Sequence, residues 1–254
     1  MEKINVFILA AGYGERLRPI TDYIPKPLLP LLGKPVIEIV LERLAGLPVD
    51  SIGINTHHKS EALKQWLDSS QYADKIEFFY EKTILGTGGA LKNAEKFLSG
   101  SAFIVHNADI LSDIDLERLA KGHFLSGNTV TLATHDFEKF NNIWIDGSGN
   151  FINVGKTETE PSPGLCKVAF TGIAMYSHDF LDFLPEGPSS VVDAWFRVLA
   201  SGKKIGTIDY TGCSWTDIGT PAAYAAAVFD GLEKAGETLY VHPAADCGNA
   251  EIKD

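Results

Sequence analysis

A glycine-rich turn with basic side chains follows the first apolar run of the chain. Gly12 and Gly14 have no Cβ atom, so the backbone there can bring its N–H groups against an anion. Arg16 offers a planar fork of donors for two phosphate oxygens, and Lys26 offers a movable point charge. Prolines on both sides of Lys26 fix the backbone and stiffen the loop that carries it. Together these residues predict a loop that holds a polyphosphate.

Two common phosphate-binding motifs do not fit this turn. A dinucleotide-binding turn requires G-x-G-x-x-G, and its third glycine would fall on Leu17. A P-loop requires Gly-Lys-Ser/Thr at the start of a helix, whereas Glu15, Arg16 and later Pro19 follow the glycines here. An arbitrary surface turn has no need of two arginines and a lysine between prolines. The sequence therefore indicates a different kind of polyphosphate loop.

An aspartate follows the predicted strand Ala102–His106. Asp109 stands where ligand-binding groups collect in open α/β sheets, beyond the carboxyl end of a parallel strand. Asp113 and Asp115 are available to cap the next helix, so capping does not require Asp109. Asp109 is therefore a candidate functional residue.

The first half of the chain must position these residues, and its pattern predicts a parallel sheet. Apolar runs alternate there with segments of helical period, which is typical of strands joined by crossover helices. The expected strands are Ile4–Ala10, Ser51–Asn55, Ile76–Tyr80 and Ala102–His106, and the expected helices run from Pro35 to Ala45, Ser60 to Leu67 and Gly88 to Phe97. We predict an α/β fold with a Rossmann-like, doubly wound sheet that is mixed and mainly parallel.

After Asn128 the pattern changes to shorter strands and turns. Strands are expected at Thr129–Thr134, Asn142–Asp146, Phe151–Val154 and Val168–Tyr176, a surface loop at Glu158–Gly164, and helices at Ser189–Ala200 and Pro221–Leu232. The predicted domain is 1–238, and it consists of two halves, 1–128 and 129–238. The tail, 239–254, resembles the first coil of a hexapeptide β-helix. A cap, a contact in a homo-oligomer, the edge of a longer protein and a tail packed on the domain all remain open for it.

Composition excludes some partners. The chain has 254 residues, is 45% hydrophobic and carries a formal net charge of −11, which argues against a nucleic-acid or anionic-membrane surface. Cys166, Cys213 and Cys247 are scattered without the spacing of metal ligands, which is typical of reduced thiols in a cytoplasm. The N-terminus runs directly into a predicted strand without a basic and apolar leader. A cytoplasmic protein is therefore expected.

The opening loop resembles the signature of a known family. The matching residues are Gly12, Gly14, Arg16, Leu17, Pro19, Thr21, Pro25, Lys26, Pro27 and Leu28, followed by the Gly33-Lys34-Pro35 turn. This run is similar to that of the sugar-1-phosphate nucleotidylyltransferases, or NDP-sugar pyrophosphorylases. The resemblance implies the nucleotide-diphospho-sugar transferase fold and continues through most of the chain. It also implies that 1–238 is a nucleotidyltransferase domain, with a nucleotide-binding half, 1–128, and a sugar-binding half, 129–238.

The resemblance implies two metal-binding carboxylates. The family segment Asn-Gly-Asp corresponds to Asn107-Ala108-Asp109, with alanine in place of glycine. A second metal motif resembles Trp215-Thr216-Asp217, followed by Gly219-Thr220 and a helix at Pro221. Asp109 and Asp217 would hold Mg²⁺ together with substrate phosphate and water, and Arg16 and Lys26 complete the expected catalytic set. Trp215 is expected in the core and Thr220 at the helix N-cap.

The same resemblance implies the nucleotide contacts. The loop Leu85-Gly86-Thr87-Gly88-Gly89 opens a helix, where backbone N–H groups can face a ligand. Glu81 can accept hydrogen bonds from guanine N1–H and N2–H₂ or from uracil N3–H, and it disfavours adenine. The expected nucleotide-binding residues are Ala11, Gly12, Gly14, Glu15, Arg16, Lys26, Glu81, Gly86, Thr87 and Asn107.

Sugar contacts are expected from Lys156, Thr171 and Gly172. Lys156 matches only the lysine of a family Glu-Lys pair, because Gly155 precedes it, and it is equally interpretable as a solvated loop lysine. The pair His57-His58 and the segment at His106 resemble a subgroup that includes manno-sugar and muramate enzymes. We interpret these histidines as structural or sugar-side groups.

The resemblance implies Mg²⁺-dependent transfer of a nucleoside monophosphate from a nucleoside triphosphate to a sugar-1-phosphate. The subgroup leaves two substrate pairs open: GTP with a mannose- or manno-heptose-type 1-phosphate, and UTP with N-acetylmuramate 1-phosphate. The loop Leu85-Gly86-Thr87-Gly88-Gly89 favours the first pair by its resemblance, and the second is the alternative. From another class, the chain could be a non-catalytic subunit that senses nucleotide sugars. Such a subunit should have lost a cation or a carboxylate, and this sequence keeps Arg16, Lys26, Asp109 and Asp217.

Overall fold

Four parallel strands form the N-terminal half of the central sheet. The computed structural model describes residues 3–155 and 163–245. The four strands lie in the spatial order β6 (Phe103–Asn107), β1 (Ile4–Leu9), β4 (Val49–Thr56) and β5 (Ile76–Tyr80). Leu9 is in register with Asn55 on one side and with Asn107 on the other. The carboxyl ends of these strands therefore lie at one edge of the sheet, as the sequence predicts.

The C-terminal half extends the same sheet with antiparallel pairs. The long strand β11 (Leu165–Tyr176) pairs antiparallel with β6, with β8 (Val130–His135) and with β9 (Ile143–Asp146). β9 forms a hairpin with β10 (Phe151–Val154), and β12 (Ile205–Asp209) runs parallel to β8. The sheet is therefore mixed, as expected, and both predicted halves of the chain contribute to it.

Helices cover both faces of the sheet, which confirms the doubly wound prediction. Side chains alternate along β1: Ile4, Val6 and Ile8 belong to one apolar cluster, and Phe7 belongs to another. The first cluster is completed by α1 (Val36–Arg43), α2 (Ser60–Asp68) and α5 (Leu116–Ser126). The second is completed by α3 (Gly86–Asn93), α4 (Glu95–Leu98) and α6 (Val191–Ala200).

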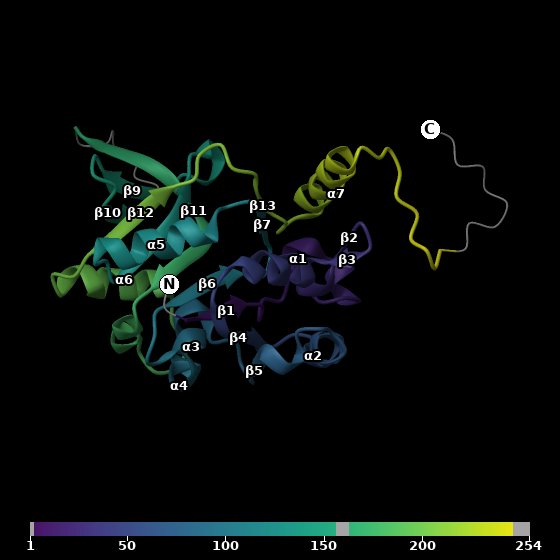
Figure 1. Cartoon of the computed structure of the whole chain (residues 1–254), viewed down its shortest axis with the longest axis horizontal. Helices are drawn as coiled ribbons and strands as arrows, with labels where there is room; N and C mark the ends of the chain where they lie inside the picture. Colours follow the sequence, from purple (N-terminus) through teal and green to yellow (C-terminus); the bar gives the residue numbers. More distant parts are fainter. Residues whose placement is uncertain (1–2, 156–162, 246–254) are drawn as a thin grey trace.

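A small antiparallel ribbon connects distant parts of the chain. β7 (Ile110–Ser112) pairs with β13 (Trp215–Asp217), which places Asp217 opposite Ile110. The next helix, α7 (Pro221–Ala235), lies beside the turn made by β2 (Pro30–Leu31) and β3 (Lys34–Pro35), apart from the other helices (Figure 1). A third apolar cluster contains residues of the opening loop, of α1 and of the C-terminal segment: Leu17, Leu29, Val36, Ile218 and Ala227. The ribbon and this cluster hold the opening loop against the C-terminal half.

Several expected elements differ in their bounds. The helix expected over Gly88–Phe97 begins at Gly86 and breaks at Ala94 into α3 and α4. The helix expected from Pro35 ends at Arg43 and continues as a 3-10 turn. The short strands β7, β12 and β13 were not expected. The 3-10 turns are Glu15–Leu17, Ile20–Asp22, Lys26–Leu28, Leu44–Gly46, Ala73–Lys75, Glu138–Phe140 and His178–Phe183.

Other expectations concern the surface and the ends of the described chain. Cys166 and Cys213 are free thiols, whereas Cys247 and most of the expected loop at 158–164 lie outside the described residues. The described part of the tail, 239–245, contains no strand, and the Tyr240 hydroxyl lies against Gly33. Within the described ranges, no helix is long and apolar enough to cross a membrane.

Candidate active site

A cavity of about 590 Å³ opens at the carboxyl edge of β1, β4, β5 and β6. In open α/β sheets ligands bind outside this edge. Asp109, an expected metal ligand, lines the cavity. So do all the residues expected to bind nucleotide: Ala11, Gly12, Gly14, Glu15, Arg16, Lys26, Glu81, Gly86, Thr87 and Asn107. The structure thus brings together residues from four separate segments that the sequence predicted as one site.

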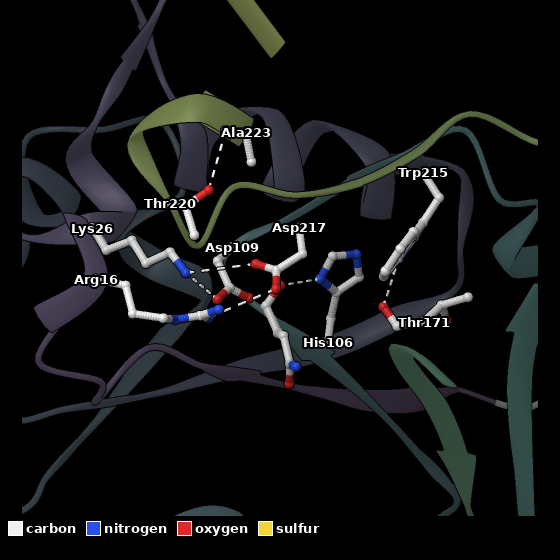
Figure 2. Close-up of polar contacts among 10 residues, drawn as sticks. Arg16, Lys26, His106, Asp109, Thr171, Trp215, Asp217, Thr220 and Ala223 are labelled. Carbon is white, nitrogen blue, oxygen red and sulfur yellow. Dashed lines mark hydrogen bonds and ion pairs between the residues drawn. The ribbon is translucent and has the colours of Figure 1, made fainter. Parts of the chain in front are cut away.

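Two cations and two carboxylates form a cluster (Figure 2), and three of these residues, Arg16, Lys26 and Asp109, line the cavity. Lys26 Nζ donates a hydrogen bond to Asp109 Oδ2 and lies 3.8 Å from Asp217 Oδ1. Arg16 Nη2 lies 3.8 Å from the other oxygen of Asp217. The Lys26 side chain is only 13% exposed, and that of Arg16 is 66% exposed. Lys26 is therefore the more buried cation beside the carboxylates, and Arg16 is the exposed one.

The ribbon explains how Asp217 reaches Asp109. The N–H of Ile218 donates to the Asp109 carbonyl at 3.1 Å, directly after the last ribbon pair. The Trp215 indole N–H donates to the Thr171 carbonyl at 2.8 Å and attaches the ribbon to β11. Thr220 Oγ1 accepts from the Ala223 N–H at 3.2 Å, so Thr220 caps α7 as predicted. Hydrogen bonds of Trp215 and Ile218 thus hold the segment that carries Asp217 on both sides of this residue.

Gly219 has no side chain, and this allows Arg16 and Asp217 to lie close to its backbone. A Cβ atom at this position would lie 2.4 Å from Arg16 Nη2 and 2.8 Å from Asp217 Oδ1. Both distances are well below normal van der Waals separations, so any side chain at Gly219 would displace the arginine or the aspartate. The sequence identified Gly219 only as part of a motif, and the structure shows that the cluster requires its small size.

The two carboxylates fit a divalent cation completed by substrate. Asp217 Oδ1 is buried and is one of the side-chain atoms in the described residues that have no hydrogen-bond partner. An unpaired buried acceptor is costly and indicates a missing donor or cation. The described parts of the chain contain no group of three or more His, Cys, Asp and Glu side chains that could hold a metal ion. Asp109 and Asp217 therefore suit Mg²⁺, which often uses one or two carboxylates together with phosphate and water.

A buried hydrogen-bond chain joins the two nucleotide loops, and the sequence did not reveal it. The Ala10 N–H donates to Asn55 Oδ1 at 2.7 Å, and Asn55 Nδ2 donates to Glu81 Oε1 at 2.7 Å. The Leu85 N–H donates to Glu81 Oε2 at 2.8 Å. Asn55 and Glu81 are 3% and 2% exposed. Both oxygens of the carboxylate expected to read the base are thus engaged within the protein, where they tie the base loop to the phosphate loop.

The glycines of the base loop have a different use from the one expected. The N–H groups of Gly88 and Gly89 donate to the Ser189 carbonyl at 2.9 and 3.3 Å, so they do not face a ligand, and that expectation is wrong. Thr87 Oγ1 accepts from the Val191 N–H at 3.0 Å. The glycines permit close packing instead, because a Cβ atom at Gly89 would lie 2.4 Å from a backbone oxygen. Gly86 and Thr87 remain in the lining of the cavity.

Two of the expected sugar residues, Thr171 and Gly172, lie outside the lining of the cavity. Thr171 is fully buried, and its hydroxyl donates to the Ala133 carbonyl at 2.8 Å, so it is not available to a ligand. Gly172 has a φ of +80° and packs against the Asn107 side chain. Lys156 lies outside the described residues. The Thr171 side chain is thus used within the fold, in a hydrogen bond to the neighbouring strand β8.

Histidines and tryptophan near the cluster have structural contacts. Burial lowers the pKa of His106 to about 4, so the ring is neutral at pH 7, and its Nδ1–H donates to the Asn107 carbonyl at 2.8 Å. Trp215, expected in the core, is only partly buried and lies in an aromatic group with His135, Phe137 and Phe140. His106 is therefore structural, as one of the two interpretations held.

Comparison with known proteins identifies the family of this chain. Residues 5–234 match the family model described as "Nucleotidyl transferase". Because this match covers most of the chain, the chain belongs to the nucleotidyl transferase family. The resemblance to sugar-1-phosphate nucleotidylyltransferases is thereby confirmed.

Curated relatives act on different substrates. Mannose-1-phosphate guanyltransferase 2 of Candida glabrata is 31% identical over 227 residues, which cover 86% of this chain and 62% of the relative. UTP–glucose-1-phosphate uridylyltransferase of Synechocystis sp. is 28% identical over 244 residues, which cover 89% of this chain and 62% of the relative. The chain thus spans less than two thirds of the length of these relatives.

Solved structures confirm the expected fold class. A UDP-glucose pyrophosphorylase complexed with UDP-glucose has a TM-score of 0.77 and 22% identity, covering 92% of this chain and all of that one. HddC from Yersinia pseudotuberculosis complexed with GMP-PN has a TM-score of 0.73 and 24% identity, covering 89% of this chain and 99% of that one. The mixed, Rossmann-like sheet is therefore shared with these proteins.

Proposed function

We propose that this chain transfers a nucleoside monophosphate from a nucleoside triphosphate to a sugar-1-phosphate with Mg²⁺, giving an NDP-sugar and pyrophosphate. The observation that carries the proposal is the position of Lys26 between Asp109 and Asp217 at the ligand-binding edge of the sheet. Carboxylates suit a divalent cation, and the basic side chains suit phosphates. Relatives named as guanyl- and uridylyltransferases of sugar-1-phosphates support the same class of reaction.

In this reaction a sugar-phosphate oxygen bonds to the α-phosphorus as the bond to the leaving pyrophosphate breaks. The nucleophile is already an anion, so the protein mainly positions the substrates and neutralises charge. The exposed Arg16 would contact the β- and γ-phosphates and the leaving pyrophosphate, and the more buried Lys26 would bridge the α-phosphate and the incoming phosphate. Asp109 and Asp217 would hold Mg²⁺, which when bound supplies positive charge between two anions that repel each other.

For the substrates we propose GTP with a mannose- or manno-heptose-type 1-phosphate. The loop Leu85-Gly86-Thr87-Gly88-Gly89 supports this choice by its resemblance to the enzymes that use these substrates, and a guanyltransferase is among the relatives. UTP is the alternative, with N-acetylmuramate 1-phosphate, and a uridylyltransferase is also among the relatives.

A substrate panel tests the proposal. Pyrophosphate release is measured for GTP and UTP, each paired with mannose-1-phosphate, a manno-heptose-1-phosphate and N-acetylmuramate 1-phosphate, with and without Mg²⁺. We expect the largest kcat/KM for GTP with a manno-sugar phosphate. Release only from UTP and the muramate phosphate would establish the alternative substrates. If no pair released pyrophosphate while a nucleotide sugar bound, the chain would be a sensing subunit and the proposed reaction would be wrong.

A further inference from the structure

A tyrosine of the opening loop lines the cavity without contributing to the charged cluster. Tyr13 lies between Gly12 and Gly14, and 45% of its surface is exposed. The ring lies edge-on to His57, with a centroid separation of 5.2 Å, and tilted against His58 at 6.0 Å. An exposed aromatic ring in a ligand cavity is an apolar surface that a planar ligand can cover.

Two successive hydrogen bonds link the Tyr13 hydroxyl through His57 to Glu81 and orient the Tyr13 ring. His57 Nδ1 lies 2.7 Å from the Glu81 carbonyl, which can only accept, so Nδ1 carries the proton. In the neutral ring Nε2 is then an acceptor, and the Tyr13 hydroxyl lies 3.2 Å from it and donates. His57 follows β4, and Glu81 follows β5. Tyr13 is therefore anchored to the chain that follows β4 and β5, on the side of β1 away from β6.

The topology gives the cavity two different ends. Asp109 follows β6, and Lys26 contacts it, so the charged end lies at the β6 side of β1. Asn55, Glu81, Ile84, Gly86 and Thr87 line the other end, beyond β4 and β5. A nucleotide whose phosphates meet Lys26 and Arg16 extends its base toward this second end. The Tyr13 ring is anchored there, although its backbone belongs to the phosphate loop.

We propose that Tyr13 is a base-stacking residue, held by His57, that strengthens binding of a purine nucleotide over a pyrimidine nucleotide. This inference rests on the proposed function. Every base has a π-face that can stack on an aromatic ring, and a purine offers the larger one. The carboxylate of Glu81 is occupied by Asn55 and Leu85. A stacking surface therefore provides base discrimination that this carboxylate does not have to supply.

The test measures binding of ligands with and without a base. Titration calorimetry with Mg²⁺ gives the Kd of GDP, UDP and inorganic tripolyphosphate for the wild type, Tyr13→Ala, Tyr13→Phe and Tyr23→Ala. In Tyr13→Ala we expect the Kd of GDP to rise about tenfold, equivalent to about 1.4 kcal/mol, and that of UDP to rise less. The Kd of tripolyphosphate should stay within twofold, because it has no base to stack.

The two other variants separate the ring from its surroundings. Tyr13→Phe keeps the ring and should restore most of the GDP affinity. Tyr23 is 84% exposed and does not line the cavity, so Tyr23→Ala should bind all three ligands like the wild type. An unchanged Kd of GDP in Tyr13→Ala would overturn the inference, and so would an equal loss for tripolyphosphate, which would show a role in the phosphate loop. Absence of pyrophosphate release by the wild type would instead refute the proposed function.

Discussion

Replacing Asn55 with aspartate should create a buried pair of carboxylates between the two nucleotide loops. Asn55 Oδ1 accepts from the Ala10 N–H, and Nδ2 donates to Glu81 Oε1 at 2.7 Å. Asn55→Asp keeps the acceptor and the shape but removes the donor. Because both residues are at most 3% exposed, solvent does not screen the resulting repulsion. One carboxyl of the pair must then keep a proton for the folded structure to persist.

The size of the effect follows from the cost of that proton. Holding a carboxyl protonated costs about 1.4 kcal/mol for each pH unit above its ordinary pKa of about 4. The variant should therefore lose about 4 kcal/mol of unfolding free energy at pH 7 and only about 1.4 kcal/mol at pH 5. At low pH the retained proton restores the hydrogen bond between the two side chains, so the stability of the variant approaches that of the wild type.

Asn141 provides a matched control at the surface. Its Oδ1 accepts from the Phe137 N–H at 2.9 Å, and its Nδ2 donates to Asp136 Oδ1 at 2.7 Å, but these side chains are exposed. Asn141→Asp makes the same substitution in water and should cost less than about 1 kcal/mol. Urea unfolding at pH 5, 6 and 7 compares the two variants. A penalty for Asn55→Asp that equals that of Asn141→Asp, or that does not grow with pH, would refute the reasoning.

Two further predictions concern the cluster and the core. Gly219→Ala should lower kcat about 10- to 100-fold by displacing Arg16 or Asp217, with little change in unfolding free energy. At Gly46 an added Cβ atom would have no atom within 4 Å apart from its chain neighbours, so Gly46→Ala should retain wild-type kcat. Equal kinetics of the two variants would contradict the role of Gly219. Burial lowers the pKa of His123 from 6.5 to about 4, so the unfolded chain binds the proton more readily and stability falls as the pH drops through this window, by about 3 kcal/mol in total. Denaturant unfolding should show a shallower fall between pH 7 and pH 4 for His123→Gln, and an unchanged slope would show that His123 is not held neutral.

Local sequence patterns predicted the sheet edge and the opening loop, because both features are determined by residues that are close together in the sequence. Continuous apolar runs identified β1 and β6, and Asp109 followed directly from the end of a strand. The spacing of the glycines and cations in the loop matches a family signature, which distinguishes this loop from other glycine-rich turns. Residues of this kind could be placed in one site before any contact was known.

Contacts between distant segments could not be predicted in the same way. The strands β7 and β13 have three residues each, too short to show a period, and their pairing helps to bring Asp217 to Asp109. Asn55 belongs to a buried strand, so its amide looked like part of a strand end rather than a link to Glu81. A signal did exist for Asn55, because a polar residue at the end of an apolar strand requires a partner.

Turnover by Asp109→Ala tests the central claim most directly. The account predicts that pyrophosphate release falls by orders of magnitude in this variant, because the proposed role of Asp109 is to hold Mg²⁺. Its unfolding free energy should stay close to that of the wild type, because the Asp109 side chain is partly exposed. Asp230→Ala removes an exposed carboxylate that pairs with Lys234 on α7 and should turn over like the wild type. Near wild-type turnover by Asp109→Ala with Mg²⁺ would contradict the account.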